Sequence, residues 1–243
     1  MTLSNSKFKK FLILTSSRAD YGLLKNLIIA IDKEKSLHKD LFVCGSHFSK
    51  KFGMTVNEIR KDKVKIKYIL KQNVHHDDEE NSIRIINQIN TKLAKIFVLQ
   101  RYDALIVLGD RYEILCACLT AKMFNIPIIH FHGGESTLSV VDDMVRHAVT
   151  KLSCLHFVSH KKYKNRLISM GESPKNVHYV GGLGASSITK IKILKKHEIE
   201  KKIKFKIPKK FFLVTYHPLT LDLKKSYIEY NNLINIIKKY NDI

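Results

Sequence analysis

Short apolar runs alternate with longer segments of helical periodicity along most of the chain. The first run, Phe11 to Thr15, leads through a polar loop into apolar residues at helical spacing that end at Ile31. The same alternation predicts further strands at 41–45, 64–70, 104–108, 126–131, 155–159 and 177–180. Helices are predicted at 81–100, 111–124, 139–152 and 160–170. Because parallel strands joined by right-handed crossovers need helices between them, the pattern predicts a Rossmann-like, doubly wound parallel α/β sheet.

The pattern changes toward the C-terminus. Residues 185–208 lose the strand pattern and become rich in Lys, and a new apolar run follows from Phe211 to Tyr216. We therefore predict a Rossmann-like domain over 1–184, a linker over 185–208 and the start of a second domain over 209–243. That second part has room for one strand and one helix (224–240), which cannot bury a core of their own.

Composition narrows the functional class. The 243 residues are 44% hydrophobic and 27% charged, which is typical of a globular protein. The net charge of +21 suits an anionic partner, but the Lys residues are spread through amphipathic stretches. No cluster of Arg and aromatic residues resembles an RNA-reading surface. We expect no nucleic acid, a largely solvated basic surface and a phosphate-bearing small molecule as the partner.

The cysteines and the N-terminus indicate the compartment. Each of the four cysteines lies in an apolar run, where a reduced thiol packs as a small hydrophobe. Cys116 and Cys118 lie on one predicted helix and point about 200° apart, which does not suit a shared metal. The apolar run Phe11 to Leu14 is too short for a signal peptide or a membrane span. We expect a cytoplasmic protein without disulfides, metal or membrane contact.

Polar residues follow the predicted strands at the edge where parallel α/β sheets bind ligands. After the first strand, residues 16–20 combine hydroxyls, the cation Arg18 and a helix N-terminus, which suits an anion. Asp20 as a helix N-cap and Arg18 as a surface charge explain this loop equally well. After the strand 104–108, Asp110 and Arg111 set a carboxylate beside a guanidinium, and Asp110 either caps the next helix or takes part in acid–base chemistry.

The segment from His130 to Glu135 follows the strand 126–131 and reads His-Phe-His-Gly-Gly-Glu. Strand geometry places His130 and His132 on one face, and the two glycines let the backbone approach a ligand. A contact surface for a sugar or diphosphate fits this segment best. A metal site and a purely structural turn are the alternatives, and the spacing does not match a helical metal motif.

Two further segments carry candidate groups. On the predicted helix from Val141, Asp142 and Arg146 are spaced i, i+4, as are Asp143 and His147, so acid–base pairs share adjoining faces. A solvated helix face looks similar, but the start of this helix at the same sheet edge favours a function. His217 ends the predicted strand of the second domain, where it faces the cleft between domains, although a lone His is more often structural.

Five segments, in order and spacing, resemble the hydrolysing UDP-N-acetylglucosamine 2-epimerases. They are SSRADYGLL (16–24), LGDR (108–111), HFHGGE (130–135), VDDMVRHAVTKLS (141–153) and TYHP (215–218). The resemblance implies a two-domain glycosyltransferase-B architecture, with the second Rossmann-like domain largely missing, and a UDP-sugar in the cleft with no cofactor. The implied reaction is anti elimination of UDP to a 2-acetamidoglucal and hydration to the free 2-epimer, for nine-carbon sugars such as sialic and legionaminic acids.

The resemblance also implies residue roles. The catalytic groups are Asp110, His132 and Asp142. The expected substrate-binding groups are Arg18, Asp20, Arg111, Glu135, Arg146 and His217, with Arg18, Arg146 and His217 on the diphosphate and Arg111 and Glu135 at the sugar. Many family members carry HIEGGE, with a Glu at the position of His132. The HFHGGE form resembles a subgroup for other UDP-diacetamido sugars, in which His132 replaces Glu as the proton carrier.

Other functions stay open at this stage. Family chains continue well beyond this length, so an inactive truncated remnant or a nucleotide-sugar binding module is one alternative. A glycosyltransferase of the same architecture and a non-hydrolysing epimerase are two others. Free 2-epimer with UDP, transfer to an acceptor, or a UDP-linked product would distinguish these functions. Assembly into a homo-oligomer also stays open.

Overall fold

The computed structural model describes residues 9–72, 79–136, 141–188, 193–216 and 223–240. The chain divides into two units, of which the first comprises residues 1–137 and 141–189 and the second residues 138–140 and 190–243. The residues that line the two cavities lie in the first unit.

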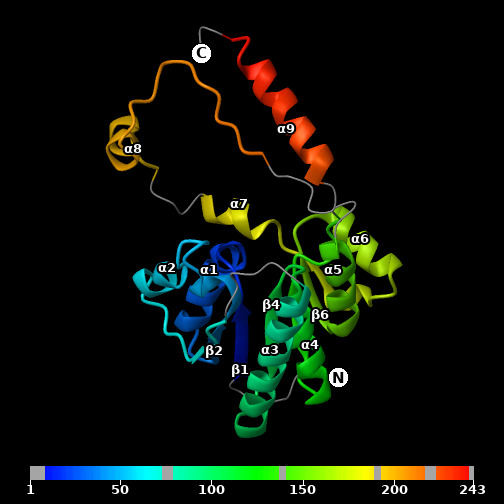
Figure 1. Ribbon diagram of the computed structural model, residues 1–243. Helices are drawn as coiled ribbons and strands as arrows, with labels where there is room; N and C mark the ends of the chain where they lie inside the picture. The colour runs from blue at the N-terminus through cyan, green and yellow to red at the C-terminus, as the bar shows by residue number, and fades with distance from the viewer. Residues whose placement is uncertain (1–8, 73–78, 137–140, 189–192, 217–222, 241–243) are drawn as a thin grey trace. The chain divides into compact units, whose positions relative to one another are not determined.

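The first unit contains a parallel sheet of seven strands in the order β3-β2-β1-β4-β5-β6-β7 (Figure 1). The strands are β1 (Lys9–Thr15), β2 (Leu37–Val43), β3 (Tyr68–Ile69), β4 (Ala104–Leu108), β5 (Ile128–Phe131), β6 (Leu155–Val158) and β7 (Val177–Tyr179). The helices are α1 (Arg18–Lys33), α2 (Val56–Lys61), α3 (Glu79–Leu99), α4 (Tyr112–Met123), α5 (Val141–Leu152), α6 (Lys161–Ser169) and α7 (Leu183–Ile188). Short 3-10 turns are formed by Gly45–Phe48 and Pro174–Asn176. The predicted Rossmann-like, doubly wound α/β fold is confirmed.

The two faces of the sheet have separate apolar cores. Leu12 and Leu14 of β1 pack in the cluster that includes residues of α3, α4 and α5, whereas Ile13 packs with residues of α1 and α2. Successive side chains of a strand point to opposite faces, so helices on both sides are needed to bury them. The fully buried residues of β4, an apolar strand with no polar position, show the same requirement.

The sheet order reverses between β1 and β4, which are neighbours although β2 and β3 lie between them in sequence. Loops on either side of such a reversal diverge to opposite faces and leave a crevice at the carboxyl ends of the strands. The polar loops that follow β1 and β4 therefore flank this crevice.

The predicted strand over 64–70 is reduced to two residues in the structure. Among the described strands it pairs only with β2, through Tyr68 opposite Phe42 and Ile69 opposite Val43, and so forms one edge of the sheet. In contrast, β2 begins at Leu37, earlier than predicted, and its Lys39 and Asp40 are buried although they are charged. The polar residues His38, Lys39 and Asp40 do not fit an apolar strand pattern, so the sequence did not predict that the strand begins at Leu37.

The second unit contains α8 (Lys196–Ile203), within the segment expected to be a linker, and α9 (Leu223–Ile237). The predicted strand from Phe211 to Tyr216 was wrong, because these described residues have no strand structure. Leu213 is 88% exposed. An apolar run becomes a strand only when a neighbouring strand supplies backbone hydrogen bonds, and the described residues of this unit form no strand.

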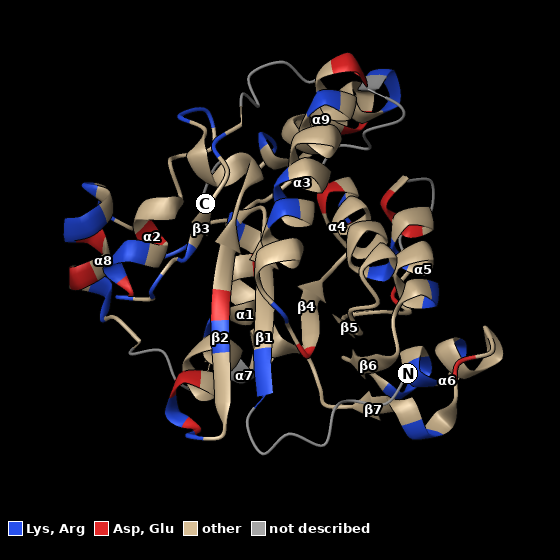
Figure 2. Cartoon of the chain, turned by 90° about the horizontal axis from the view of Figure 1, so that it is seen from below, with Lys and Arg blue, Asp and Glu red and all other residues tan. Residues whose placement is uncertain are grey.

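Charges are distributed over many elements. Figure 2 shows Lys and Arg on several separate helices, among them α2, α6 and α8. No helix in the described part of the chain is long and apolar enough to cross a membrane. All four cysteines are free, and burial with the charge of Glu113 raises the pKa of the Cys116 thiol to about 12, as expected for an unreactive core position.

Candidate functional site

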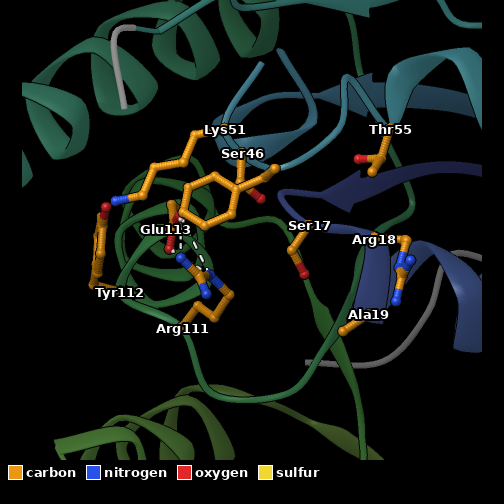
Figure 3. Close-up of a pocket in the computed structure, with 10 residues that line it drawn as sticks. Ser17, Arg18, Ala19, Ser46, Lys51, Thr55, Arg111, Tyr112 and Glu113 are labelled. Carbon is orange, nitrogen blue, oxygen red and sulfur yellow. Dashed lines mark hydrogen bonds and ion pairs between the residues drawn. The ribbon is translucent and has the colours of Figure 1, made fainter. Parts of the chain in front are cut away.

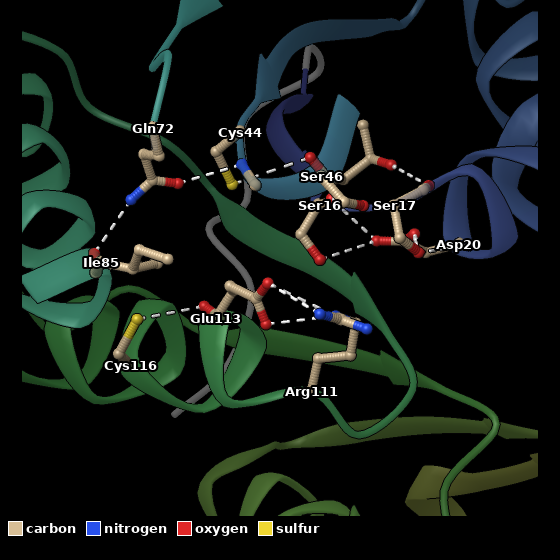
Figure 4. Close-up of polar contacts among 12 residues, drawn as sticks. Ser16, Ser17, Asp20, Cys44, Ser46, Gln72, Ile85, Arg111, Glu113 and Cys116 are labelled. Carbon is tan, nitrogen blue, oxygen red and sulfur yellow. Dashed lines mark hydrogen bonds and ion pairs between the residues drawn. The ribbon is translucent and has the colours of Figure 1, made fainter. Parts of the chain in front are cut away.

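The loop after β1 is fixed by a buried carboxylate. Asp20 accepts hydrogen bonds from the backbone N–H of Ser16 at 2.7 Å and from the hydroxyl of Ser17 (Figure 4). Ser17, not Asp20, is the N-cap of α1, and its Oγ accepts from the Asp20 N–H. The N-cap alternative for Asp20 is therefore wrong, and Asp20 shapes the loop from the first turn of the helix.

Arg18 occupies the first position of α1 and is exposed. It makes no ion pair with another described residue. A guanidinium at a helix N-terminus adds to the positive end of the helix dipole and to the free backbone N–H groups. This end of α1 is therefore suited to a negatively charged ligand.

An ion pair between Arg111 and Glu113 lies where the turn after β4 leads into α4. Arg111, not Asp110, is the N-cap residue of α4, so helix capping does not explain Asp110. Arg111 donates to Glu113 through Nε to Oε2 and through Nη2 to Oε1, both at 3.2 Å (Figure 4). Burial lowers the pKa of Arg111, but the charge and hydrogen bonds of Glu113 outweigh burial and raise it above its usual value.

Sequence reasoning missed Glu113, which is almost completely buried. The available signal was an acidic residue in the first turn of a helix, two positions after an Arg at the same sheet edge. Such residues are common on solvated helices, so only the fold distinguishes this one. Its role is to hold Arg111 in one orientation beside the crevice.

A first cavity of about 530 Å³ lies where α1, the turn after β2 and the start of α4 meet (Figure 3). Its lining is Ser17, Arg18, Ala19, Ser46, Lys51, Phe52, Thr55, Arg111, Tyr112 and Glu113. Three cations against one carboxylate suit an anionic group. The residues after β2 were not singled out from the sequence. Gly45 permits their close approach, since a Cβ there would lie 2.6 Å from the Ser16 carbonyl oxygen.

A second cavity, of about 190 Å³, shares Ser17, Ala19 and Arg111 with the first. Its lining is Ser17, Ala19, Asp20, Leu23, Leu108, Gly109, Asp110, Arg111, His132, Glu135 and Arg146. Six of the residues named from the sequence are therefore brought together: Asp20, Asp110, Arg111, His132, Glu135 and Arg146. Asp142 is exposed in the first turn of α5 and is not among the described residues that line this cavity. His217 lies outside the described residues.

Arg146 connects three elements around the second cavity. It is buried, forms an ion pair with Asp110, and donates to the backbone carbonyl of Glu135 at 2.9 Å. It also contacts Asp143 at 3.3 Å, and in the described part of the chain it forms no pair with Asp142. The predicted i, i+4 pairing of Arg146 is thus replaced by i, i+3, because its side chain turns toward Asp110. The other predicted pair, Asp143 with His147, is present at 3.6 Å.

The two histidines near the end of β5 have different environments, since His130 lies within the strand and His132 just after it. The strand ends at Phe131, and His132 has a left-handed backbone with φ of +64°, so simple strand alternation stops there. His130 is fully buried, with Nε2 2.9 Å from the Gly109 carbonyl and Nδ1 3.3 Å from the Thr150 hydroxyl. Burial lowers its pKa to about 4, so His130 is neutral and supports the turn before Asp110.

His132 is the histidine that lines the second cavity. Its Nδ1 lies 2.9 Å from Glu135 Oε1, while its Nε2 has no hydrogen-bond partner among the described residues. A carboxylate on one ring nitrogen fixes the ring and leaves the other nitrogen for proton transfer. Within the described residues, no group of His, Cys, Asp and Glu is arranged to hold a metal ion.

Comparison with known proteins gives consistent relatives. A family model described as UDP-N-acetylglucosamine 2-epimerase matches residues 29–243. The chain is 36% identical over 226 residues to the GDP/UDP-N,N'-diacetylbacillosamine 2-epimerase (hydrolyzing) of Campylobacter jejuni, covering 93% of this chain and 59% of that protein. It is 35% identical over 229 residues to the polysialic acid biosynthesis protein P7 of Escherichia coli, covering 94% and 58%. The chain thus spans somewhat less than two thirds of the length of these curated relatives.

Solved structures agree with the fold. The S. aureus MnaA structure with UDP matches with a TM-score of 0.79 and 23% identity, over 97% of this chain and 61% of that one. A likeness at this identity concerns the backbone arrangement alone. It supports the doubly wound sheet described above.

Proposed function

The chain belongs to the UDP-N-acetylglucosamine 2-epimerase family, and we propose that it acts as a hydrolysing 2-epimerase of a UDP-linked 2-acetamido sugar. The products are UDP and the free sugar inverted at C2. The relative from C. jejuni carries a diacetamido sugar in its name, which favours a UDP-diacetamido sugar over UDP-N-acetylglucosamine as the substrate. The name of the E. coli relative supports a place in the synthesis of sialic-acid-like sugars.

The observation that carries this proposal is the meeting of Asp110, His132 and Arg146 around one cavity. In the elimination, a base removes the proton at C2, the C1–O bond to UDP breaks, and a C1=C2 double bond forms. In the hydration, water gives a hydroxyl to C1 and a proton is added to C2 from the opposite side. The reaction therefore needs two proton-transferring groups on different sides of the sugar.

Asp110 and His132 suit these two roles because they come from different strand ends. Asp110 follows β4 and is held by Arg146, and His132 follows β5 and is held by Glu135. We assign one half-reaction to each of them. Asp142 stays a proposed third catalytic group on the basis of family resemblance, at the exposed start of α5.

The departing diphosphate is assigned to the cationic side of the crevice. Arg18 at the N-terminus of α1 and Arg111 at the start of α4 both line the first cavity, so we assign both to the negative charge that forms as the C1–O bond breaks, although the resemblance had assigned Arg111 to the sugar. His217 stays a proposed diphosphate ligand on the basis of the family resemblance alone. Arg111 also lines the second cavity, which connects the diphosphate end of the substrate to the sugar end.

The test is product analysis in D₂O with UDP-N,N'-diacetylbacillosamine and, in parallel, UDP-N-acetylglucosamine. We expect UDP release, a free 2-epimer with one solvent deuterium at C2, and a higher kcat/KM for the diacetamido substrate. A UDP-linked 2-epimer would instead identify a non-hydrolysing enzyme, and transfer to an acceptor would identify a glycosyltransferase. Saturable binding without UDP release would identify a binding module.

A further inference from the structure

The carboxylate of Glu135 has a hydrogen-bond partner outside the second cavity. Its Oε1 accepts a hydrogen bond from the hydroxyl of Ser159 at 2.6 Å, in addition to its contact with His132 Nδ1. Ser159 follows β6 and precedes α6, so it belongs to neither the turn of His132 nor the cavity lining. Two donors on a single oxygen fix the rotation of the carboxylate about its last side-chain bond.

Helix α6 also fixes the backbone of the same turn. Arg166 Nη1 donates to the Gly134 carbonyl at 2.6 Å. A Cβ at Gly134, where φ is +78°, would lie 2.4 Å from Leu167 Cδ1 and 2.9 Å from the Tyr163 carbonyl oxygen. The turn and helix α6 are therefore in direct contact, and Ser159 immediately precedes the N-cap residue of that helix, His160.

We propose that Ser159 is a positioning residue, whose hydroxyl holds Glu135 so that Glu135 orients His132 and leaves Nε2 directed to proton transfer. This inference rests on the proposed function only for its kinetic consequence. The contact from Ser159 through Glu135 to His132 stands on the distances alone. No family motif quoted above contains Ser159, since it lies between VDDMVRHAVTKLS and the second unit.

The contact has an electrostatic consequence. Burial raises the pKa of the Glu135 carboxyl, but the hydrogen bonds from His132 and Ser159 outweigh burial and lower the pKa below its ordinary value. Among the described residues, Arg146 and Arg166 also contact this turn through the Glu135 and Gly134 carbonyls, and Arg146 is paired in turn with Asp110 and Asp143. Removing the Ser159 hydroxyl removes a donor to the ionised form, so the carboxyl should take up its proton at a higher pH.

The experiment compares Ser159→Ala with Ser159→Thr, which keeps the hydroxyl, and with Ser169→Ala, a matched change at an exposed position at the end of α6. For Ser159→Ala we expect kcat to fall about tenfold or more, as when a partner orienting a functional histidine is lost. KM should stay within about twofold, because the substrate contacts remain. The acid limb of the kcat profile should move up by roughly one pH unit.

A second measurement is independent of turnover. The carboxyl of Glu135 is followed by ¹³C NMR in Glu-labelled protein, assigned with Glu135→Gln, and its titration should move up in Ser159→Ala and return in Ser159→Thr. An unmoved titration overturns the proposal whether or not the protein is an epimerase. A kcat loss with an unchanged pH profile and no recovery in Ser159→Thr would show a merely structural role. Absence of turnover in the unaltered protein, with the titration shifted as expected, would contradict the proposed function and keep the contact.

Discussion

Two carboxylates in the first unit, Asp40 and Asp110, both form ion pairs with basic side chains, but Asp40 is enclosed by its partners and Asp110 lines a cavity. Asp40 accepts from Lys67 and from the hydroxyl of Tyr102, both at 2.7 Å, and Lys10 lies 3.6 Å away. Its side chain is 5% exposed. Among the described residues, Asp110 pairs with one cation, Arg146, and its side chain is 23% exposed and lines a cavity.

The difference lies in the position along the strands. The partners of Asp40 are near the beginnings of β1, β3 and β4, where Lys10, Lys67 and Tyr102 all contact its Oδ2. His38 Nε2 lies 3.3 Å from the other oxygen, Oδ1. Asp110 is at the carboxyl end of β4, beside the reversal of strand order, where loops diverge and leave space. A buried, paired carboxylate at the beginnings of the strands therefore indicates a contribution to stability, whereas one at their carboxyl ends is a candidate for ligand binding or catalysis. Burial and ion pairing alone do not distinguish these two roles.

The largest effect is expected for Asp110→Asn, which keeps the shape of the side chain and removes its charge. UDP release should fall about 1000-fold, the range for loss of an acid–base group. The free energy of unfolding should fall by no more than about 2 kcal/mol, because Arg146 keeps its contact with Asp143 and its hydrogen bond to the Glu135 carbonyl. Product assays and urea unfolding measure the two quantities. Near-normal turnover would show that Asp110 has no catalytic role, and its difference from Asp40 would then have no functional meaning.

The converse is expected for Asp40→Asn. Lys67 and Lys10 would lose their counter-charge, so the free energy of unfolding should drop by about 3 kcal/mol. UDP release per folded molecule should stay unchanged. Glu80→Gln is the control, since its pair with Arg84 is mostly exposed and should contribute less than about 0.5 kcal/mol. Equal losses for the two variants in urea unfolding would show that the Asp40 cluster is not a stabilising one.

The smallest effect is a pH dependence of stability from the same cluster. Burial raises the pKa of Asp40, but the hydrogen bonds of Lys67 and Tyr102 and the lysine charges outweigh it and lower the pKa below 3.8. A carboxyl lowered on folding stabilises the protein above its unfolded pKa, and this contribution is lost as pH falls through the folded one. Between pH 6 and pH 3 we expect a loss on the order of 1 kcal/mol that Asp40→Asn lacks. Parallel curves for both proteins in urea titrations would contradict this.

The sequence predicts the sheet well because its strands are apolar on both faces, as β4 shows. It also predicts that Asp110, His132 and Glu135 lie close together, because each follows a strand that ends at the same edge. It cannot predict that Arg146 chooses Asp110 over Asp142, since that choice depends on how α5 is rotated against the sheet. The same holds for Glu113, whose burial depends on the packing of α4.

Other misses have a different cause, which is dependence on partners distant in sequence. The run Phe211 to Tyr216 has strand composition but lacks a neighbouring strand in its described surroundings. Lys51 and Thr55 reach the first cavity from a long connection after β2 that has no motif of its own. Asp40 looks like a break in a strand until Lys67 and Tyr102 are placed around it. Long-range pairing of this kind is not encoded in local periodicity.

Gly134 lies in the turn between His132 and Glu135, and this turn packs against α6. A side chain at Gly134 would collide with the Tyr163 carbonyl oxygen of α6, so the glycine lets the turn pack directly against the backbone of this helix. Helix α6 packs mainly on the outer strands β6 and β7, far along the sheet from β1. Local opening at this flank of the domain would therefore disorder the turn that contains His132 while the central strands stay folded, so this turn should have a lower free energy of opening than the domain as a whole.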